Sequence, residues 1–324
     1  LDAPVDFASR DSATIGGAVA TNAGGSRVVR FGTMRSQVAG VQAVLADGST
    51  VGSLAGLPKE TVGLHWPSLL AGSEGTLGVV TAARLRLVPW YRATTTALVA
   101  VAGLEEAVSL LARLRARVRA LDAVELILPE AMAVVAAHLG RRPPIGDDAT
   151  GAFVVVECAD HTDPTDELTA VLAAAPEVLD TAIATSGPAR HGLLELRDRI
   201  TESIAALGVP LKLDVAVPVG ALAELMAEVR ASVERHGGRL VPFGHLAEGN
   251  VHVNVLDAAD PADITDEVLG AAAALGGTIS AEHGVGTAKT PYLHLVRSTD
   301  ELRAAAALRR ALDPAAVLNP GVLG

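Results

Sequence analysis

The clearest alternation of apolar and polar positions lies in the C-terminal third of the chain. Residues 239–246 are apolar and strand-like, a four-residue turn follows, and residues 251–255 alternate strictly. This pattern predicts a β-hairpin, because successive residues of a strand face opposite sides of its sheet. His252 and Asn254 are therefore expected on one face, with His245 at the end of the partner strand.

From residue 94 onward, strand-like and helix-like segments alternate. Residues 191–207 predict one helix, on which Arg197 and Thr201 lie four positions apart and are neighbours. The interleaving indicates an α+β sandwich with helices on one face of a sheet. The other expected strands are 97–102, 123–128, 153–158, 211–217 and 277–281, and the other expected helices are 104–119, 129–139, 163–175, 218–236, 266–275 and 300–312.

Two segments among the first ninety residues, 14–32 and 72–78, are rich in glycine and lack helical periodicity. Glycine lets backbone N–H groups approach a phosphate or a flat ring closely, although a set of tight turns explains the composition equally well. Two such segments so near each other favour one shared ligand. Pro89 and Trp90 are expected to mark a boundary.

The composition allows two domains with cores built from small aliphatic residues. The chain has 324 residues, of which 50% are hydrophobic and only 2% aromatic, so Ala, Val and Leu must fill the cores. No apolar run reaches bilayer-spanning length, and no charged-then-apolar leader begins the chain, so neither a transmembrane helix nor a signal peptide is expected. A single cysteine, Cys158, cannot form an internal disulfide, which favours a cytoplasmic protein.

The net charge of −11 argues against nucleic acid as a partner, because phosphate binding needs a basic face. Attachment to an anionic membrane surface is disfavoured for the same reason. Small-molecule chemistry remains the class of function to consider.

Ligand-type side chains gather in two late motifs. His245, His252 and Glu282 are a set suited to zinc, or to manganese or iron, with positions left open for a substrate. Histidines satisfied within the core are the alternative. His283 adjoins Glu282 and would face the opposite way in a regular strand, but Gly284 allows a turn that directs both side chains to one place.

Arg197 and Lys212 are basic residues within otherwise apolar elements. Buried cations need partners, so either an anionic ligand or a structural salt bridge is expected.

Several motifs, in this order, resemble the FAD-dependent D-2-hydroxyacid dehydrogenases, the group of the glycolate oxidase subunit, D-lactate dehydrogenase and D-2-hydroxyglutarate dehydrogenase within the vanillyl-alcohol-oxidase flavoprotein superfamily. The motifs are TIGGAVATNAGG, VRFGTMR, LLAGSEGTLGVVT, FGHLAEGNVHVNV, ISAEHGVG and ALDPAAVLNPG.

The resemblance implies three regions: the C-terminal part of an FAD-binding domain of the PCMH type in residues 1–89, a ferredoxin-like α+β substrate or cap domain with a metal site in residues 90–297, and a C-terminal helix and tail in residues 298–324 that returns to the FAD domain. Residues near FAD would be Gly16, Gly17, Thr21, Asn22, Gly24, Gly32, Glu74, Gly75, Gly78, Val79 and Asn319. Metal ligands would be His245, His252 and Glu282; the base would be His283; substrate would meet Arg197, Thr201, Lys212 and Asn254.

The expected reaction is oxidation of a D-2-hydroxyacid to the 2-oxoacid. A divalent metal acidifies the hydroxyl, His283 takes its proton, and hydride passes to N5 of FAD. Electrons would continue to an electron-transfer flavoprotein, a quinone, a cytochrome or a partner subunit. The chain lacks the family's usual pyrophosphate loop and is expected to be N-terminally truncated. A non-catalytic remnant that binds FAD weakly, or a metal-dependent hydrolase, are the rival hypotheses.

Overall fold

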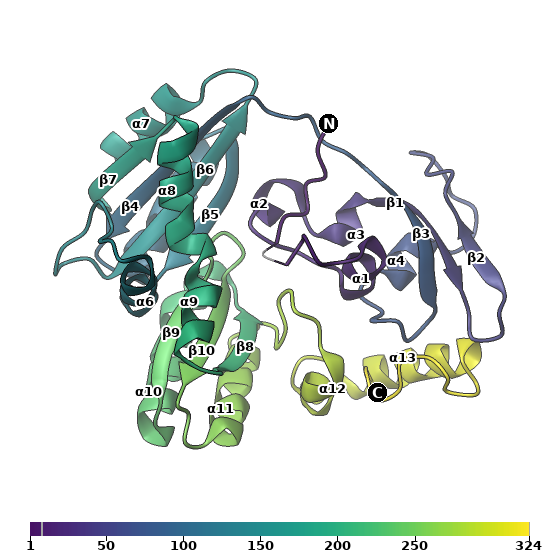
Figure 1. Ribbon diagram of the computed structural model, residues 1–324. Coiled ribbons are helices and arrows are strands. Elements are labelled where there is room, and N and C mark those ends of the chain that lie inside the picture. Colours follow the sequence, from purple (N-terminus) through teal and green to yellow (C-terminus); the bar gives the residue numbers. More distant parts are fainter. Residues whose placement is uncertain (8, 324) are drawn as a thin grey trace. The chain divides into compact units, whose positions relative to one another are not determined.

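The computed structural model describes residues 1–7 and 9–323. The chain forms two compact units (Figure 1). Unit 1 comprises Leu1–Trp90 and Ile279–Gly324, and unit 2 comprises Tyr91–Thr278. Among the described residues, no helix has both the length and the apolar character needed to cross a bilayer.

Unit 2 is built on a seven-stranded antiparallel sheet with the strand order β7-β4-β6-β5-β9-β10-β8. Its strands are β4 (Ala93–Val101), β5 (Leu121–Ile127), β6 (Ala152–Asp160), β7 (Val178–Ala184), β8 (Leu211–Ala216), β9 (Arg239–His245) and β10 (Asn250–Leu256). The predicted hairpin is confirmed as β9 and β10. The edge strand β7 was not predicted, since half-exposed residues interrupt its apolar pattern.

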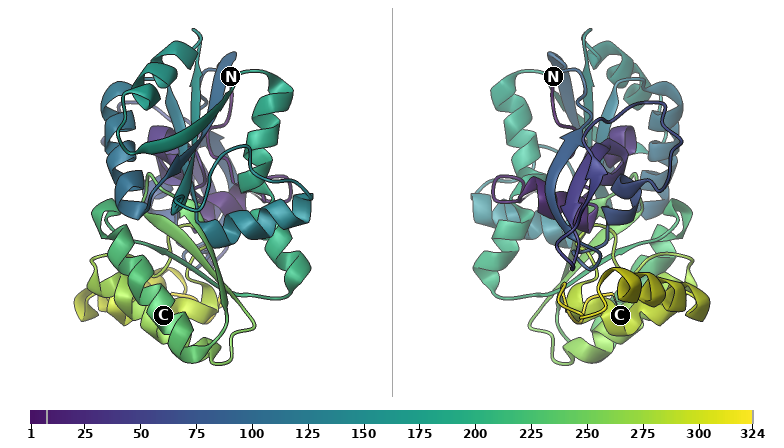
Figure 2. Two further views of the ribbon diagram at one scale, coloured as in Figure 1. Left: turned by 90° about the vertical axis from the view of Figure 1, so that its left-hand side faces the viewer. Right: turned by 90° about the vertical axis from the view of Figure 1, so that its right-hand side faces the viewer.

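Helices cover both faces of this sheet, rather than the one face predicted (Figure 2). The helices of unit 2 are α5 (Leu104–Arg117), α6 (Pro129–Leu139), α7 (Thr165–Ala173), α8 (Gly187–Asp198), α9 (Ile200–Leu207), the 3₁₀ turn η1 (Val219–Ala221), α10 (Leu222–His236) and α11 (Pro261–Ala274). The helices α6, α8 and α9 share one core with sheet residues such as Leu98, Ile127 and Val241.

The strand β10 shows why both faces need cover. Its sequence alternates, which is typical of a strand with one wet face, yet every one of its residues is buried. Val251, Val253 and Val255 enter an apolar layer, while Asn250 and the alternate polar residues are buried on the other face. A buried polar face is the informative observation here, because such side chains must find partners.

Unit 1 holds a three-stranded antiparallel sheet with the order β2-β1-β3. Its elements are α1 (Ile15–Thr21), α2 (Val28–Phe31), α3 (Met34–Gln37), β1 (Val38–Val44), β2 (Thr50–Ser53), α4 (Trp66–Leu70), β3 (Val79–Leu85), α12 (Gly286–Lys289), the 3₁₀ segment η2 (Thr290–Leu295) and α13 (Thr299–Leu312). Its core includes Val19, Val41 and Leu70, all fully buried.

The first glycine-rich segment contains a helix, α1, which its composition did not predict. Thr14 caps the helix by accepting a hydrogen bond from the Gly17 amide at 3.0 Å, and Asn22 ends it in the left-handed region at φ 53°. Ala18 and Val19 are buried against the sheet. Capping and burial together offset the entropic cost of two glycines in one short helix.

Candidate active site

One face of the sheet in unit 2 carries a continuous row of buried polar side chains. The cross-strand register places Glu125 of β5 opposite His245 of β9, and His245 opposite Asn250 of β10. One step further along, His252 of β10 stands opposite Asp214 of β8. Residues at directly opposite positions have neighbouring side chains, so β5, β9, β10 and β8 together bring these groups to one place.

His245 and Glu125 form a close buried pair. The Nδ1 atom of His245 lies 2.7 Å from Oε1 of Glu125. The other carboxylate oxygen, Oε2, lies 2.7 Å from Nη2 of Arg197, which comes from helix α8. The Arg197 guanidinium also lies 4.6 Å from the centre of the Phe243 ring. One carboxylate therefore contacts both an imidazole and a guanidinium.

His252 has a carboxylate partner of its own. Its Nδ1 lies 3.3 Å from Oδ1 of Asp214. The amide of Asn250 donates to the same oxygen at 2.8 Å and to the Val215 carbonyl at 2.8 Å, which fixes the orientation of Asp214. The rings of His245 and His252 meet edge to face, with their centres 5.2 Å apart.

A comparison within this face shows what sets the charge of Glu125. Burial opposes its ionisation, but the adjacent His245 imidazole and the Arg197 guanidinium outweigh burial and hold the pKa of Glu125 below its usual value. Glu157 on β6 has a similar arginine partner, Arg190, at 3.0 Å. Burial nevertheless raises the pKa of Glu157. Glu125 has the His245 imidazole as an additional partner, whereas Asp122 and Asp198 add their negative charges to the effect of burial at Glu157.

Glu248, in the turn between β9 and β10, is a further buried carboxyl. Burial raises its pKa to about 7, against the opposing effect of His245. Neither of its carboxylate oxygens has a hydrogen-bond partner in another described residue. The sequence placed this position only in a turn, so its burial is a finding of the structure.

The two imidazoles fit a divalent metal ion. A carboxylate accepts but cannot donate, so the short Glu125 contact requires the proton of a neutral His245 on Nδ1 and leaves the lone pair on Nε2. Metal-binding histidines in proteins typically have such a carboxylate partner. Zinc–nitrogen bonds of about 2.1 Å at tetrahedral angles would bring two ring centres to roughly 5 Å from each other. The observed separation of 5.2 Å is close to that value, and of the two imidazoles His252 belongs to a group of possible metal ligands, together with Asp214.

The four residues expected to hold substrate differ in their surroundings. Arg197 forms the salt bridge that sequence analysis left as the alternative, while its Nε is buried without a hydrogen-bond partner among the described residues. Asn254 is 5% exposed and donates to the Val241 and His252 carbonyls.

The other two, Thr201 and Lys212, are exposed. Lys212 stands opposite Asn254 in the strand register. The single predicted helix over residues 191–207 is wrong, because α8 ends at Asp198 and α9 begins at Ile200.

In unit 1, the structure brings the two glycine-rich segments together. The Gly72 amide donates to the Val19 carbonyl at 3.1 Å, and the Glu74 amide donates to the Ala20 carbonyl at 2.8 Å. The second segment therefore contacts the C-terminal turn of α1.

The residues expected near FAD all lie in this unit: Gly16, Gly17 and Thr21 on α1, Asn22 and Gly24 after it, Gly32 after α2, Glu74, Gly75 and Gly78 in the second segment, Val79 at the start of β3, and Asn319 in the tail.

The side chains of four of these residues have partners within the protein, and one of them is Asn22, whose Oδ1 accepts from the Arg35 amide at 2.9 Å. The Thr21 hydroxyl donates to the Gly17 carbonyl at 3.0 Å. The carboxylate of Glu74 accepts hydrogen bonds from the Val285 amide at 2.7 Å and from the Gly286 amide at 2.8 Å. Asn319 donates to the Glu74 carbonyl. Glu74 thus holds the turn that follows His283.

Glu282 and His283 lie in the segment of unit 1 that begins at Ile279. The predicted strand over 277–281 reduces to one bridge between Thr278 and Ala216, after which the backbone bends. Nε2 of His283 lies 3.4 Å from Oε1 of Glu282, and the His283 side chain is 57% exposed. The glycine turn does direct both side chains to one place, as the sequence suggested.

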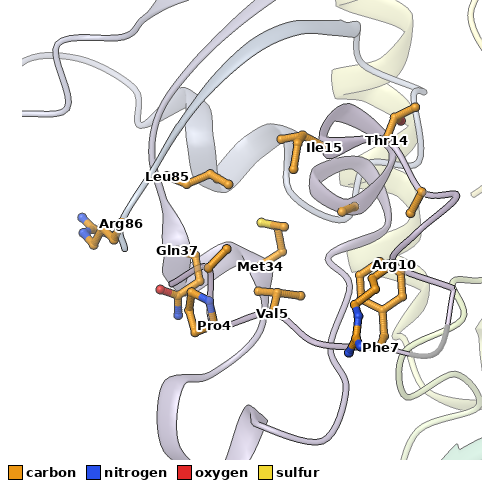
Figure 3. A pocket seen from close by; sticks show the side chains of 13 residues that line it. Pro4, Val5, Phe7, Arg10, Thr14, Ile15, Met34, Gln37, Leu85 and Arg86 are labelled. Carbon is orange, nitrogen blue, oxygen red and sulfur yellow. The ribbon is translucent and has the colours of Figure 1, made fainter. Parts of the chain in front are cut away.

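Unit 1 also contains an apolar pocket beside α1 (Figure 3). Pro4, Val5 and Phe7 of the N-terminal segment lie across from Ile15 and Leu85. None of the residues expected to contact FAD, metal or substrate lines it.

Sequence reasoning missed the two carboxylates that partner the imidazoles. Both were covered only by expected strands, Glu125 by 123–128 and Asp214 by 211–217. An acid within a mostly apolar strand was the available indication, because unpartnered acids are seldom buried.

Comparison with known proteins identifies the relatives of this fold. Residues 91–323 match the family model of the C-terminal domain of FAD linked oxidases, and residues 1–52 match an FAD binding domain. The chain is 37% identical over 338 residues to D-2-hydroxyglutarate dehydrogenase of Xanthomonas citri pv. viticola, covering 99% of this chain and 70% of the relative. It is 33% identical over 332 residues to the mitochondrial D-2-hydroxyglutarate dehydrogenase of Bos taurus, covering 98% of this chain and 60% of the relative.

Solved structures show the same fold at low sequence identity. A 4-ethylphenol oxidase from Gulosibacter chungangensis superimposes with a TM-score of 0.72 at 18% identity, over 99% of this chain and 71% of that one. An alkyldihydroxyacetonephosphate synthase gives a TM-score of 0.68 at 17% identity, over 98% and 59%. These likenesses confirm the predicted α+β fold class. Because some relatives are mitochondrial, a cytoplasmic location stays a prediction.

Proposed function

Because the chain belongs to the family of FAD-linked oxidases, we propose that the full-length protein oxidises a D-2-hydroxyacid of the D-2-hydroxyglutarate type to the 2-oxoacid. The chain spans about 60% of the length of the Bos taurus relative. The observation that carries the proposal is the polar face of unit 2, where two carboxylate-partnered imidazoles lie on the sheet that also binds a buried arginine. A 2-hydroxyacid offers a hydroxyl and a carboxylate to such a face.

FAD, when bound by the glycine-rich segments of unit 1, would supply the electron acceptor for the alcohol carbon. A divalent cation held by His245, His252 and Glu282 would supply a Lewis acid that lowers the pKa of the substrate hydroxyl. Glu282 is four residues beyond Thr278, whose backbone pairs with Ala216 of β8.

The residues of the chain would divide the remaining work. His283 would accept the hydroxyl proton, for which an exposed imidazole with a nearby carboxylate is suited. Arg197 would bind the carboxylate adjacent to the hydroxyl, through its buried Nε. Lys212 and Thr201 would contact the distal end of a dicarboxylate, and Asn254 would help to orient the substrate. An external acceptor would then receive the electrons.

The rival hypotheses are not favoured. A metal-dependent hydrolase would have no need of the segment that matches an FAD binding domain. A non-catalytic remnant would not need to retain, over 98% of its length, similarity to relatives named as dehydrogenases. The buried partners of both imidazoles likewise support a working site.

Turnover by the full-length protein tests the proposal. With an artificial dye as acceptor, D-2-hydroxyglutarate is expected to be oxidised faster than glycolate or D-lactate, with bleaching of the flavin under anaerobic conditions. His283→Ala should lower kcat about 10²- to 10⁴-fold, since it removes the proposed base, and should leave the metal content unchanged.

The exposed His191, outside this site, provides the control. His191→Ala should retain the parent kcat. Loss of bound metal in His283→Ala, or a parent kcat in it, would remove His283 from the role of base. Failure of every D-2-hydroxyacid to bleach the flavin would refute the proposed reaction.

A further inference from the structure

Glu125 of β5 lies between two residues that the proposed function uses, His245 and Arg197. We propose that Glu125 is a positioning residue, which orients His245 toward the metal ion and holds Arg197 in the geometry that receives the substrate carboxylate. This inference rests on the proposed function and deepens it, because it makes metal binding and substrate binding depend on one side chain.

The backbone fixes where Glu125 lies. It stands opposite His245 in the antiparallel pairing of β5 with β9, at the centre of the sheet. Glu125 is only 4% exposed, and His245 is 7% exposed. A carboxylate in such a place is stable only with close partners, so its two contacts at 2.7 Å are structural requirements of the folded state.

The contact with His245 selects one tautomer of the imidazole. Since an ionised carboxylate only accepts, Nδ1 must carry the proton, and a neutral ring then offers its lone pair at Nε2. The negative charge also makes the ring a stronger donor to a cation. Without Glu125, the ring could rotate and carry its proton on either nitrogen.

The contact with Arg197 fixes the guanidinium. Nη2 is bound to Oε2 of Glu125, and the plane lies over the Phe243 ring at 4.6 Å. Phe243 in turn lies 4.9 Å from the His252 ring. With these contacts made, the buried Nε remains as the donor without a hydrogen-bond partner among the described residues. A substrate carboxylate would accept a hydrogen bond from this Nε.

The chain supplies a matched control in Glu157. Arg190 precedes Arg197 by seven residues on the same helix, α8, and pairs with Glu157 of β6 at 3.0 Å. Glu157 makes an arginine contact similar to that of Glu125, but its second side-chain partner is the Thr96 hydroxyl where Glu125 has an imidazole. A change that appears on substitution of either glutamate reflects the loss of a structural contact. A change that appears only on substitution of Glu125 reflects its role in the candidate site.

The experiment compares Glu125→Gln with Glu157→Gln in the full-length protein. Zn²⁺ affinity is measured by competition with a chromogenic chelator, and kcat and KM are measured for the oxidised D-2-hydroxyacid. Glu125→Gln is expected to weaken Zn²⁺ binding about 10- to 100-fold and to raise KM, while Glu157→Gln stays within about twofold of the parent. Equal Zn²⁺ affinity in Glu125→Gln and the parent overturns the inference.

A second variant guards against misfolding. Removing one charge leaves Arg197 buried without its counter-ion, so Glu125→Gln combined with Arg197→Met removes both charges. The double variant should melt close to the parent and still bind Zn²⁺ at least about 10-fold more weakly, because His245 has lost its carboxylate. Recovery of parent affinity in the double variant would overturn the inference. A parent that binds no Zn²⁺ would refute the proposed metal site itself.

Discussion

The two regions that carry the predicted chemistry are built in opposite ways. On the sheet of unit 2, side chains hold other side chains, as Glu125 does with His245. In the glycine-rich region of unit 1, the backbone makes most of the contacts, as when the Gly72 amide donates to the Val19 carbonyl. The site on the sheet therefore depends on the identity of its side chains. The glycine-rich turns depend instead on positions that carry no side chain.

This difference decides what kind of substitution each region tolerates. In unit 2, an isosteric change such as glutamate to glutamine keeps the packing and alters only charge. In unit 1, the addition of one methyl group can be worse than any change of charge, because main chains approach each other directly. This contrast leads to three predictions, and each of them tests whether the two regions differ in this way.

The largest effect is expected in unit 1 from Gly25→Ala. At φ 123°, a Cβ atom on residue 25 would lie 1.8 Å from the Asp6 carbonyl oxygen, which is far inside van der Waals contact. Because a main-chain atom cannot move aside cheaply, we expect a loss of more than about 4 kcal/mol in stability. Calorimetric melting of the full-length protein measures it.

Gly48→Ala is the matched control for that variant. Gly48 also has a positive φ, 83°, but nothing lies within 4 Å of its added Cβ. Only the intrinsic cost of the left-handed conformation, about 1–2 kcal/mol, should appear. If both alanine variants lose the same stability, close backbone approach is not what defines this region.

An intermediate effect, which depends on pH, is expected in unit 2 from Glu248→Gln. The folded pKa of Glu248 is raised from 4.5 to about 7, so the folded state keeps a proton that the unfolded state releases. Stability of the parent should therefore fall as pH rises from about 4.5 to 7 and then level off. The glutamine variant lacks this loss and should gain up to about 3 kcal/mol over the parent across that window.

Denaturant unfolding with a chelator present, at pH 5 and pH 8, measures the gain. Chelation is needed because a bound cation near His245 would change the local charge. The exposed Glu234 serves as the control, and Glu234→Gln should show the parent pH dependence. A pH profile of Glu248→Gln that parallels the parent profile would contradict the assignment.

The smallest effect is expected in unit 1 from Glu74→Gln, at a place where a charged side chain holds a backbone turn. The amide group has one oxygen where the carboxylate had two, so either the Val285 or the Gly286 amide loses its acceptor. Charge-assisted hydrogen bonds contribute about 1.5–3 kcal/mol. Hydrogen exchange at these two amides should accelerate about 10- to 100-fold, with the exposed Glu60→Gln as control. Unchanged exchange would show that glycine geometry alone holds the turn.

The sequence was most informative where side chains alternate. The β9–β10 hairpin was predicted because His252 and Asn254 interrupt an apolar strand with period two, and these residues do share a buried polar face. It was least informative where tertiary contacts decide. No proline or glycine marks Arg199, yet α8 ends just before it. The helix α1 needed Thr14 as a cap, and glycine content alone argued against it.

The partners of the imidazoles could not be predicted for a related reason. Glu125 is separated from His245 by 120 residues, and only the pairing of β5 with β9 joins them. The two acids of β5, Asp122 and Glu125, show no period that identifies which of them partners an imidazole. The strand order β6-β5-β9-β10, which brings them together, depends on long-range packing that short sequence patterns do not contain.

The seven-residue interval between Arg190 and Arg197 has a consequence for how α8 can change. Seven residues are close to two full helical turns, so both guanidiniums leave the helix on nearly the same side and reach Glu157 and Glu125 of one sheet. Inserting or deleting one residue between them would rotate one arginine about 100° away from its glutamate. Point substitutions can accumulate along this segment, but its length between the two arginines is fixed.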